Sequence, residues 1–213
     1  MPEIAAMFWD VGGVLLTNGW DRQARRQAVE RFELDAEEFE DRHELVVSDF
    51  ETGRLSLDRY LERTVFYRPR RFGPDDLKTF MFAQSQPYAE RLAIVVRLAR
   101  SRRYLLGTLN NESTELNRYR IERFRLCEYF SVFISSCCVG LRKPDEAIYR
   151  LAVDVTQCRP DRCLFIDDRA VNVESAAKLG MRTIHYQDPD QLQRELRRLG
   201  VHGVAEAADP GTC

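Results

Sequence analysis

Lysine is scarce in this chain of 213 residues. Only Lys78, Lys143 and Lys178 occur among its 32 basic residues, and the other 29 are arginines. The 34 acidic residues bring the net charge to −2, so the basic excess that is typical of nucleic-acid-binding proteins is missing. Because lysines are so few, we expect one that stands at a chemically demanding position to have a function there.

Long apolar runs are missing too. No run approaches the ~20 apolar residues needed to span a bilayer, and the N-terminal residues lack the basic and then apolar pattern of a signal peptide. The six cysteines form no CxxC pair and no Cys/His cluster with zinc spacing, so we expect most of them to be reduced thiols in the core. These absences predict a cytoplasmic protein with no membrane segment and no nucleic-acid partner.

What is present is the composition of a soluble globular protein, with 44% hydrophobic and 31% charged residues. Five short apolar runs are typical of buried strands, and they cover residues 4–9, 104–109, 132–135, 163–166 and 183–186. Helical patterns separate the last four, over residues 112–125, 144–156 and 170–179, with Pro144 at a first helical position. This alternation predicts an α/β fold with a doubly wound parallel sheet.

The first two predicted strands are separated by more residues than one crossover helix needs. Residues 21–32, 35–47, 56–66 and 74–82 have the patterns of four helices, and Asp35 and Glu38 have the spacing of a capping box. We therefore predict a small α-helical cap domain over residues 20–82, inserted into a core of residues 1–19 and 83–204. Residues 205–213 are predicted to be a flexible tail.

Polar residues follow four of the predicted strands, directly or in the next loop. They are Asp10, the pair Asn110 and Asn111, Lys143, and the pair Asp167 and Asp168. In an open parallel sheet the ligand crevice lies beyond the carboxyl ends of the strands, so we expect these side chains to converge. A carboxylate there can act as a nucleophile, clustered carboxylates suit Mg²⁺, and lysine and amide donors can hold a transferring group.

Two other classes of α/β domain share some of these features, but their motifs do not match this sequence. A dinucleotide-binding domain needs GxGxxG after the first strand, and Gly12-Gly13 does not supply it. A phospho-receiver domain also uses an acidic cluster and a lysine. It places the acidic pair at its first strand, whereas here the pair follows the fourth.

At these residues the sequence resembles the haloacid dehalogenase-like (HAD) hydrolase superfamily, over about residues 4–199. The resemblance is carried by Asp10-Val-Gly-Gly-Val, Gly140-Leu-Arg-Lys-Pro-Asp-Glu-Ala-Ile-Tyr, Phe165-Ile-Asp-Asp-Arg-Ala-Val-Asn and Ala176-Ala-Lys-Leu-Gly-Met. It is nearest to the branch with sugar-phosphate phosphatases and the N-terminal phosphatase domain of soluble epoxide hydrolases. The resemblance implies a Mg²⁺-dependent phosphatase of a small phosphorylated metabolite, with the helical cap closing over the site.

The resemblance also implies roles for single residues. Asp10 matches the nucleophilic aspartate and a metal ligand, and the backbone carbonyl of Gly12 falls at another metal-ligand position. Asp168 matches the direct metal ligand of the acidic motif, and Asp167 is expected to act through water. Asn172 stands where many relatives have a second acid of that motif.

Around the phosphoryl group, Lys143 matches the lysine that pairs with both the nucleophile and the phosphate. Asn110 stands where most relatives have a Ser or Thr that holds a phosphoryl oxygen, and its amide can still donate a hydrogen bond. Asn111 is assigned to phosphate binding beside it. Both asparagines have an alternative reading as turn formers before a helix.

The most consequential departure is Gly12, which replaces the aspartate that serves most family phosphatases as general acid and base. Such assistance contributes ~10²–10⁴-fold in rate, so leaving groups that depart without a proton are expected to suffer least. Glycine at this position has a structural explanation if the backbone needs φ > 0. Two alternatives to a phosphatase stay open, a dehalogenase-type hydrolase and a catalytically weak or non-enzymatic binding protein.

Two further expectations concern charged residues. Asp167 and Asp168 have an alternative reading as structural partners of Arg142 or Arg169. The four arginines in the helical segment after Asn111 are spread around several helix faces, so we expect a solvated surface at Arg118, Arg120, Arg123 and Arg125.

Overall fold

The computed structural model describes residues 2–203, and its centre is a five-stranded parallel sheet with the order β3-β2-β1-β4-β5. The strands are β1 (Ala6–Trp9), β2 (Leu105–Asn110), β3 (Val132–Ser135), β4 (Cys163–Asp167) and β5 (Arg182–His185). Phe8 in the central strand lies beside Gly107 of β2 and Phe165 of β4. All five predicted strands are confirmed.

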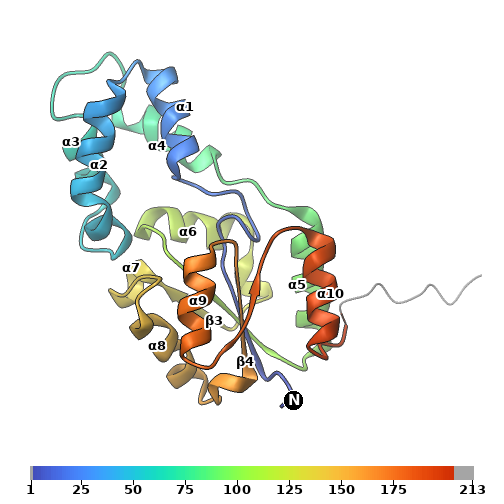
Figure 1. Cartoon of the computed structure of the whole chain (residues 1–213). Coiled ribbons are helices and arrows are strands. Elements are labelled where there is room, and N and C mark those ends of the chain that lie inside the picture. Colours follow the sequence, from blue (N-terminus) through green and yellow to red (C-terminus); the bar gives the residue numbers. More distant parts are fainter. Residues whose placement is uncertain (1, 204–213) are drawn as a thin grey trace, which may run out of the picture.

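Helices cover both faces of this sheet (Figure 1). Met7 and Trp9 of β1 point to the face covered by α5 (Ala89–Ser101) and α10 (Pro189–Arg198). Ala6 and Phe8 point to the opposite face, where α8 (Glu146–Thr156) and α9 (Ala170–Lys178) pack. Because successive residues of a strand alternate between faces, a strand buried on both sides is apolar throughout. The predicted doubly wound α/β fold is confirmed.

The helices differ from the prediction at several ends. Helix α6 covers Thr114–Arg123, and α8 begins at Glu146 rather than at Pro144, because the Asp145 side chain caps it by accepting from the backbone N–H of Ala147. The short α7 (Ser136–Val139) and the α10 helix have no counterpart in the prediction. Two 3₁₀ turns complete the core, at Leu126–Glu128 and Pro160–Arg162.

A helical insert leaves the core after β1 and returns before β2 (Figure 1). It consists of α1 (Arg22–Phe32), α2 (Ala36–Glu51), α3 (Leu57–Thr64) and α4 (Pro74–Ala83), which is the predicted set of four helices. The residues before α1, α2 and α3 are Asp21, Asp35 and Ser56, and each accepts a hydrogen bond from a backbone N–H of the first turn. The cap has its own apolar core, which includes Trp20, Phe39, Phe50, Tyr60 and Met81.

Two linkers join the insert to the core, and they pair with each other. The Thr17 N–H donates to the Gln86 carbonyl at 2.8 Å, and Leu16 forms an isolated bridge with Pro87. These contacts agree with the predicted cap over residues 20–82, although that boundary and the core range of 1–19 and 83–204 stay predictions. The predicted tail over residues 205–213 lies outside the described residues.

The cap also contacts the core where α2 ends. Ser136 at the start of α7 donates through Oγ to the Glu51 carbonyl at 2.5 Å. Gly53 has φ +74, and a Cβ there would lie 2.2 Å from the Cys137 carbonyl oxygen, so only glycine fits this approach. This corner therefore fixes where the C-terminal end of α2 sits on the core.

Two expectations about the rest of the chain have simple outcomes. In the described part of the chain, no helix is long and apolar enough to cross a membrane.

The expectation that most cysteines are core thiols is wrong. Among the five described cysteines, Cys163 is buried, Cys127 and Cys138 are exposed, and all five are free thiols.

Candidate active site

Asp10 and Lys143 form an ion pair at the carboxyl edge of the sheet. Asp10 follows β1, where its N–H donates to the Ile166 carbonyl of β4 at 2.9 Å. Lys143 Nζ lies 2.9 Å from Asp10 Oδ1 and 2.6 Å from Asp167 Oδ2. The Val11 N–H donates to the same Asp10 Oδ1 at 2.8 Å. The lysine that sequence analysis singled out therefore bridges two of the predicted carboxylates.

Burial sets the electrostatics of this group. Lys143, Asp10 and Asp167 are 3%, 8% and 0% exposed. Burial raises the pKa of Asp10 to about 7, against the opposing effect of Lys143 and with smaller contributions from the Asp167 and Asp168 charges. The neighbouring carboxylates Asp10 and Asp167 hold the pKa of Lys143 above its ordinary value in spite of its burial. Two buried carboxylates thus share one ammonium, and burial works against the charged form of Asp10.

Asp168 adds a third carboxylate. One carboxylate oxygen from each of Asp10, Asp167 and Asp168 lies within 4.8 Å of the others. This confirms that Asp10 and Asp168 share one site. Burial, followed by the Asp167 charge, raises the pKa of Asp168. Oxygen ligands at this spacing fit a hard divalent cation, which would balance the carboxylate charge.

Gly13 is required by this cluster. Its φ is +78, and a Cβ on it would lie 2.1 Å from Asp168 Oδ2. A side chain is therefore excluded by both the backbone conformation and the carboxylate.

Asn172 and the backbone hold Asp167 in place. Asn172 Nδ2 lies 3.0 and 3.1 Å from the two Asp167 carboxylate oxygens, and the Arg169 N–H donates to Oδ1 at 2.8 Å. Within the described residues, the ion-pair partner of Asp167 is Lys143 rather than Arg142 or Arg169. The start of α9 therefore orients the acidic motif.

The two asparagines after β2 have different surroundings. Asn110 is 2% exposed, and its amide is part of a buried network in which it donates to Asn117 at 3.2 Å and accepts from Ser135 Oγ at 2.9 Å. Asn111 contacts the backbone of Lys143 in both directions, at 2.8 and 2.9 Å. Neither residue is a simple turn former. Asn110 links the end of β2 to Asn117 and Ser135, and Asn111 links the loop after β2 to the Lys143 backbone.

The space beside Gly12 is occupied. The φ of Gly12 is not in the left-handed region, so the expectation that φ > 0 accounts for this glycine is wrong. A Cβ at position 12 would lie 2.8 Å from Asn18 Oδ1 and 3.5 Å from Arg120 Nη1. Of these two contacts only that with Asn18 is too close for a Cβ, and it is made by the end of an exposed side chain that can move, so neither backbone strain nor packing requires glycine here.

Arg120 was expected to be solvated, and this expectation is wrong. It is 2% exposed, and its guanidinium lies 2.9 Å from Glu112 Oε2. It also donates to Ser85 Oγ and to the Thr17 carbonyl, both at 3.0 Å. A buried arginine is stable only with such partners. Its partners come from distant segments, so the local charge pattern carried no signal for them.

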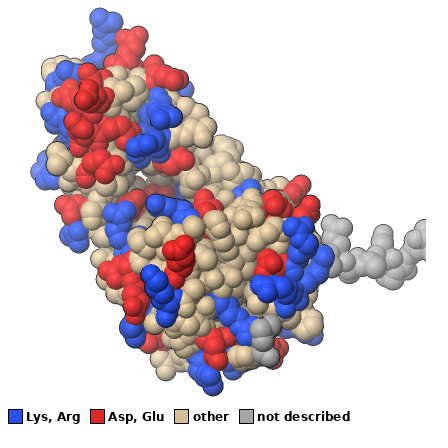
Figure 2. Space-filling model, in the orientation of Figure 1, with Lys and Arg blue, Asp and Glu red and all other residues tan. Residues whose placement is uncertain are grey.

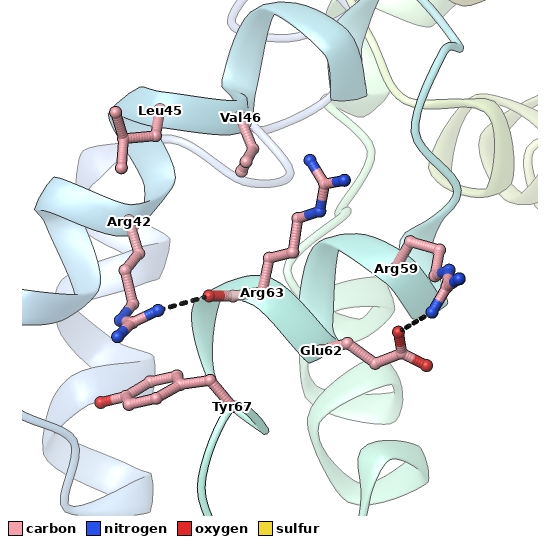
Figure 3. Close-up of a pocket in the computed structure, with 7 residues that line it drawn as sticks. All are labelled: Arg42, Leu45, Val46, Arg59, Glu62, Arg63 and Tyr67. Atoms are coloured by element: carbon pink, nitrogen blue, oxygen red, sulfur yellow. Dashed lines mark hydrogen bonds and ion pairs between the residues drawn. The ribbon is translucent and has the colours of Figure 1, made fainter.

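A separate hollow of about 600 Å³ lies on the cap between α2 and α3 (Figure 3). It is lined by Arg42, Leu45, Val46, Arg59, Glu62, Arg63 and Tyr67, none of which belongs to the acidic cluster. In Figure 3 the Arg42 guanidinium donates to the Arg63 carbonyl, and Arg59 pairs with Glu62. Across the face in Figure 2, acidic and basic side chains are interspersed on both the cap and the core.

The chain thus combines a helical insert, a doubly wound parallel sheet and an aspartate–lysine pair at the sheet edge. The profile of the haloacid dehalogenase-like hydrolases matches residues 4–180. The chain therefore belongs to the haloacid dehalogenase-like hydrolase family.

Several relatives have known names. The chain is 28% identical over 161 residues to flavin mononucleotide hydrolase 1 of Arabidopsis thaliana, which is 76% of this chain and 64% of that protein. It is 31% identical over 134 residues to phosphatase MT3486 of Mycobacterium tuberculosis, 61% of this chain and 59% of that protein. With bifunctional epoxide hydrolase 2 of Sus scrofa the identity is 37% over 91 residues, 41% of this chain and 16% of that protein. The chain thus matches less than two thirds of each relative.

Solved structures share the fold. A HAD family enzyme of Bacteroides thetaiotaomicron, in complex with magnesium and inorganic phosphate, has a TM-score of 0.74 at 18% identity, over 86% of this chain and 94% of that one. A dehalogenase with an intermediate complex has a TM-score of 0.64 at 17% identity, over 88% and 86% of the two chains. At these identities the likeness concerns the fold alone.

Proposed function

We propose that this hydrolase is a Mg²⁺-dependent phosphatase of a small phosphorylated metabolite, with Asp10 as its nucleophile. The observation that carries the proposal is the placement of Lys143 between Asp10 and Asp167, with Asp168 completing a set of carboxylates within 4.8 Å. Three carboxylates beside an incoming phosphate are tolerable only with a cation among them, since like charges repel. Phosphatases among the relatives, and magnesium with phosphate in a structural neighbour, support the same assignment.

The oxygens of Asp10, Asp167 and Asp168, with the Gly12 carbonyl, would hold the Mg²⁺ ion. When bound, the ion supplies charge neutralisation for the phosphate and for the carboxylates. We keep Asp168 as the direct ligand and Asp167 as the ligand that acts through water, because both Asp167 oxygens already accept hydrogen bonds from the protein.

The chain's own residues define the first step. Asp10 Oδ1 is held by the Val11 N–H and by Lys143, which leaves Oδ2 to attack the phosphorus atom. The bond from Oδ2 to phosphorus forms as the bond from phosphorus to the leaving oxygen breaks, and the leaving oxygen keeps the electron pair. Lys143 stabilises the charge on the phosphoryl oxygens. Water then hydrolyses the aspartyl-phosphate, which releases phosphate and restores Asp10.

Asn110 and Asn111 are proposed to act at the phosphate in different ways. The second amide hydrogen of Asn110 is available to a phosphoryl oxygen after its bond to Asn117. Asn111 positions Lys143 through the two backbone hydrogen bonds. Asn172 acts through Asp167, which it holds with two amide contacts.

A substrate screen tests the proposal. It measures phosphate release from sugar phosphates, nucleotides, flavin mononucleotide and acyl phosphates, with and without Mg²⁺, beside halide release from a haloacid. We expect metal-dependent phosphate release that Asp10→Asn abolishes. Metal-independent halide release would favour a dehalogenase-type hydrolase instead. No turnover, with phosphorylated compounds still bound, would favour a binding protein.

A further inference from the structure

The side chain of Asn18 lies over Gly12, two residues after the proposed nucleophile. Its Oδ1 lies 2.8 Å from the position of a Cβ on Gly12, and 3.7 Å separates that position from the Asn18 Cα. Asn18 is exposed, and its carboxamide makes no hydrogen bond within the described part of the chain. An amide group with unused donors and acceptors therefore stands at the edge of the nucleophile loop.

The backbone around Asn18 is held from several sides. The preceding Thr17 donates its N–H to the Gln86 carbonyl at 2.8 Å, and its carbonyl accepts from Arg120 Nη2 at 3.0 Å. The following Gly19 is buried, and a Cβ there would lie 2.3 Å from Arg120 Nη2. Arg120 is itself fixed by its ion pair with Glu112. A buried arginine thus positions the exposed asparagine.

The direction of the reaction brings a substrate past this asparagine. In an in-line displacement the leaving oxygen points away from the attacking atom, and Asp10 attacks from the edge of the sheet. The leaving group therefore extends toward the cap. Asn18 lies in the linker between β1 and the first cap helix α1, with its side chain over Gly12.

We propose that Asn18 is a specificity-determining residue that contacts the leaving-group oxygen of the phosphate ester. This inference rests on the proposed phosphatase function and adds the part of the substrate that is recognised. As the bond from phosphorus to the leaving oxygen breaks, the oxygen keeps the electron pair and accepts a hydrogen bond from the Asn18 amide. It then takes its proton from water, because a carboxamide does not give up a proton at neutral pH. Asn18 thus selects esters whose leaving group departs as an anion.

Three variants test this role. Asn18→Ala removes the donor, Asn18→Asp puts a carboxyl group in the same place, and Gln86→Glu adds the same charge to the paired linker, where Gln86 is exposed. Each is assayed over pH with an aryl phosphate and with a primary alkyl phosphate. Binding of inorganic phosphate, which has no leaving group, is measured by calorimetry.

We expect Asn18→Ala to lower kcat/KM by about 3- to 10-fold, the effect of one lost hydrogen bond, while its Kd for inorganic phosphate stays unchanged. We expect Asn18→Asp to speed cleavage of the alkyl phosphate by up to ~10²-fold and to add a falling limb to the pH profile, since the protonated carboxyl group donates a proton to the leaving oxygen. Gln86→Glu should show neither effect.

Three results would count against these expectations in different ways. If the parent protein releases phosphate from none of the substrates, the proposed function is wrong and the role of Asn18 is wrong with it. If the parent is active but both Asn18 variants behave like Gln86→Glu, the phosphatase assignment stands and the role of Asn18 is wrong. A weakened Kd for inorganic phosphate in Asn18→Ala would likewise contradict a contact with the leaving group alone.

Discussion

The side chain of Asn111 and the backbone of Lys143 hydrogen-bond to each other in both directions. The Lys143 N–H donates to Asn111 Oδ1 at 2.8 Å, and Asn111 Nδ2 donates to the Lys143 carbonyl at 2.9 Å. The loop after β2 therefore sets the backbone position of the lysine that contacts Asp10. Asn111, which the sequence assigned to phosphate binding, therefore also positions the backbone of Lys143.

Replacing Asn111 by Ala should misplace Lys143. We expect kcat/KM to fall by about 10- to 100-fold, because small displacements of a charged group near the reacting atoms are costly. We expect the free energy of unfolding to fall by about 1–3 kcal/mol. Steady-state kinetics and urea denaturation measure the two effects. Ser175→Ala is the control, since Ser175 donates to the neighbouring Pro144 carbonyl at 2.6 Å and should leave kcat/KM unchanged.

The carboxylate cluster predicts a strong effect of metal removal. EDTA should abolish phosphatase activity and lower the melting temperature, since a ligand that binds the folded state stabilises it. Asp168→Asn should remove most of the rise in melting temperature that Mg²⁺ produces. Glu174→Gln is the matched control, because Glu174 is an exposed carboxylate on α9. Full turnover in chelator would contradict the metal-dependent reaction.

His43 in the cap predicts a loss of stability in mild acid. Burial, helped by the Arg25 charge, lowers the pKa of His43 to about 4, from an ordinary value of 6.5. Trp20 Nε1 donates to Tyr60 Oη at 2.8 Å, so the Tyr60 hydroxyl is left to donate to His43 Nδ1, also at 2.8 Å. Protonated His43 would place two donors against each other.

Below pH 6.5 the unfolded chain binds a proton at His43 that the folded protein does not bind until about pH 4. The free energy of unfolding should therefore fall as the pH decreases through this range, by up to about 3 kcal/mol. His43→Gln keeps an acceptor for Tyr60 and should lose less stability between pH 7 and pH 4.5. Urea titrations at both pH values check this, with the exposed His202→Asn as control. Equal losses in the parent and His43→Gln would contradict the assignment.

The Arg120–Glu112 pair is a stability determinant. Arg120→Met leaves Glu112 buried without its partner, and we expect the free energy of unfolding to fall by about 3–5 kcal/mol. Pairing the change with Glu112→Leu should recover much of the loss, since an apolar pair leaves no unpaired charge. Arg118→Met on the exposed face of α6 should change stability by less than about 0.5 kcal/mol. Chemical denaturation of the parent and the three variants tests this.

The sequence predicted the sheet and its edge well for a physical reason. Strands buried on both faces are short apolar runs, and the first polar residue after each run marks the edge where ligands bind. The convergence of Asp10, Lys143 and Asp168 could be expected in this way, whereas their individual roles were implied by the family resemblance. Local patterns of this kind need no knowledge of distant partners.

The features that were missed depend on contacts between distant segments. The sequence pattern does not distinguish Arg120 from the other arginines of its helical segment. Its burial depends on Glu112, Thr17 and Ser85, which contact it from other parts of the chain. Asn18 is an ordinary loop residue until the fold places it over Gly12. The start of α8 was misplaced because Pro144 and Asp145 are both acceptable at a helix start, and capping by Asp145 decided between them.

The pairing of Thr17 with Gln86 holds the two ends of the insert side by side. The chain leaves and re-enters the core at one place, so a short turn could join the two linkers without moving any strand of the sheet. Recombination that exchanges everything between these two points for another insert would keep the carboxylates, the lysine and their hydrogen bonds. On the proposed function, such an exchange would change the surface that meets the substrate and leave the acidic cluster in place.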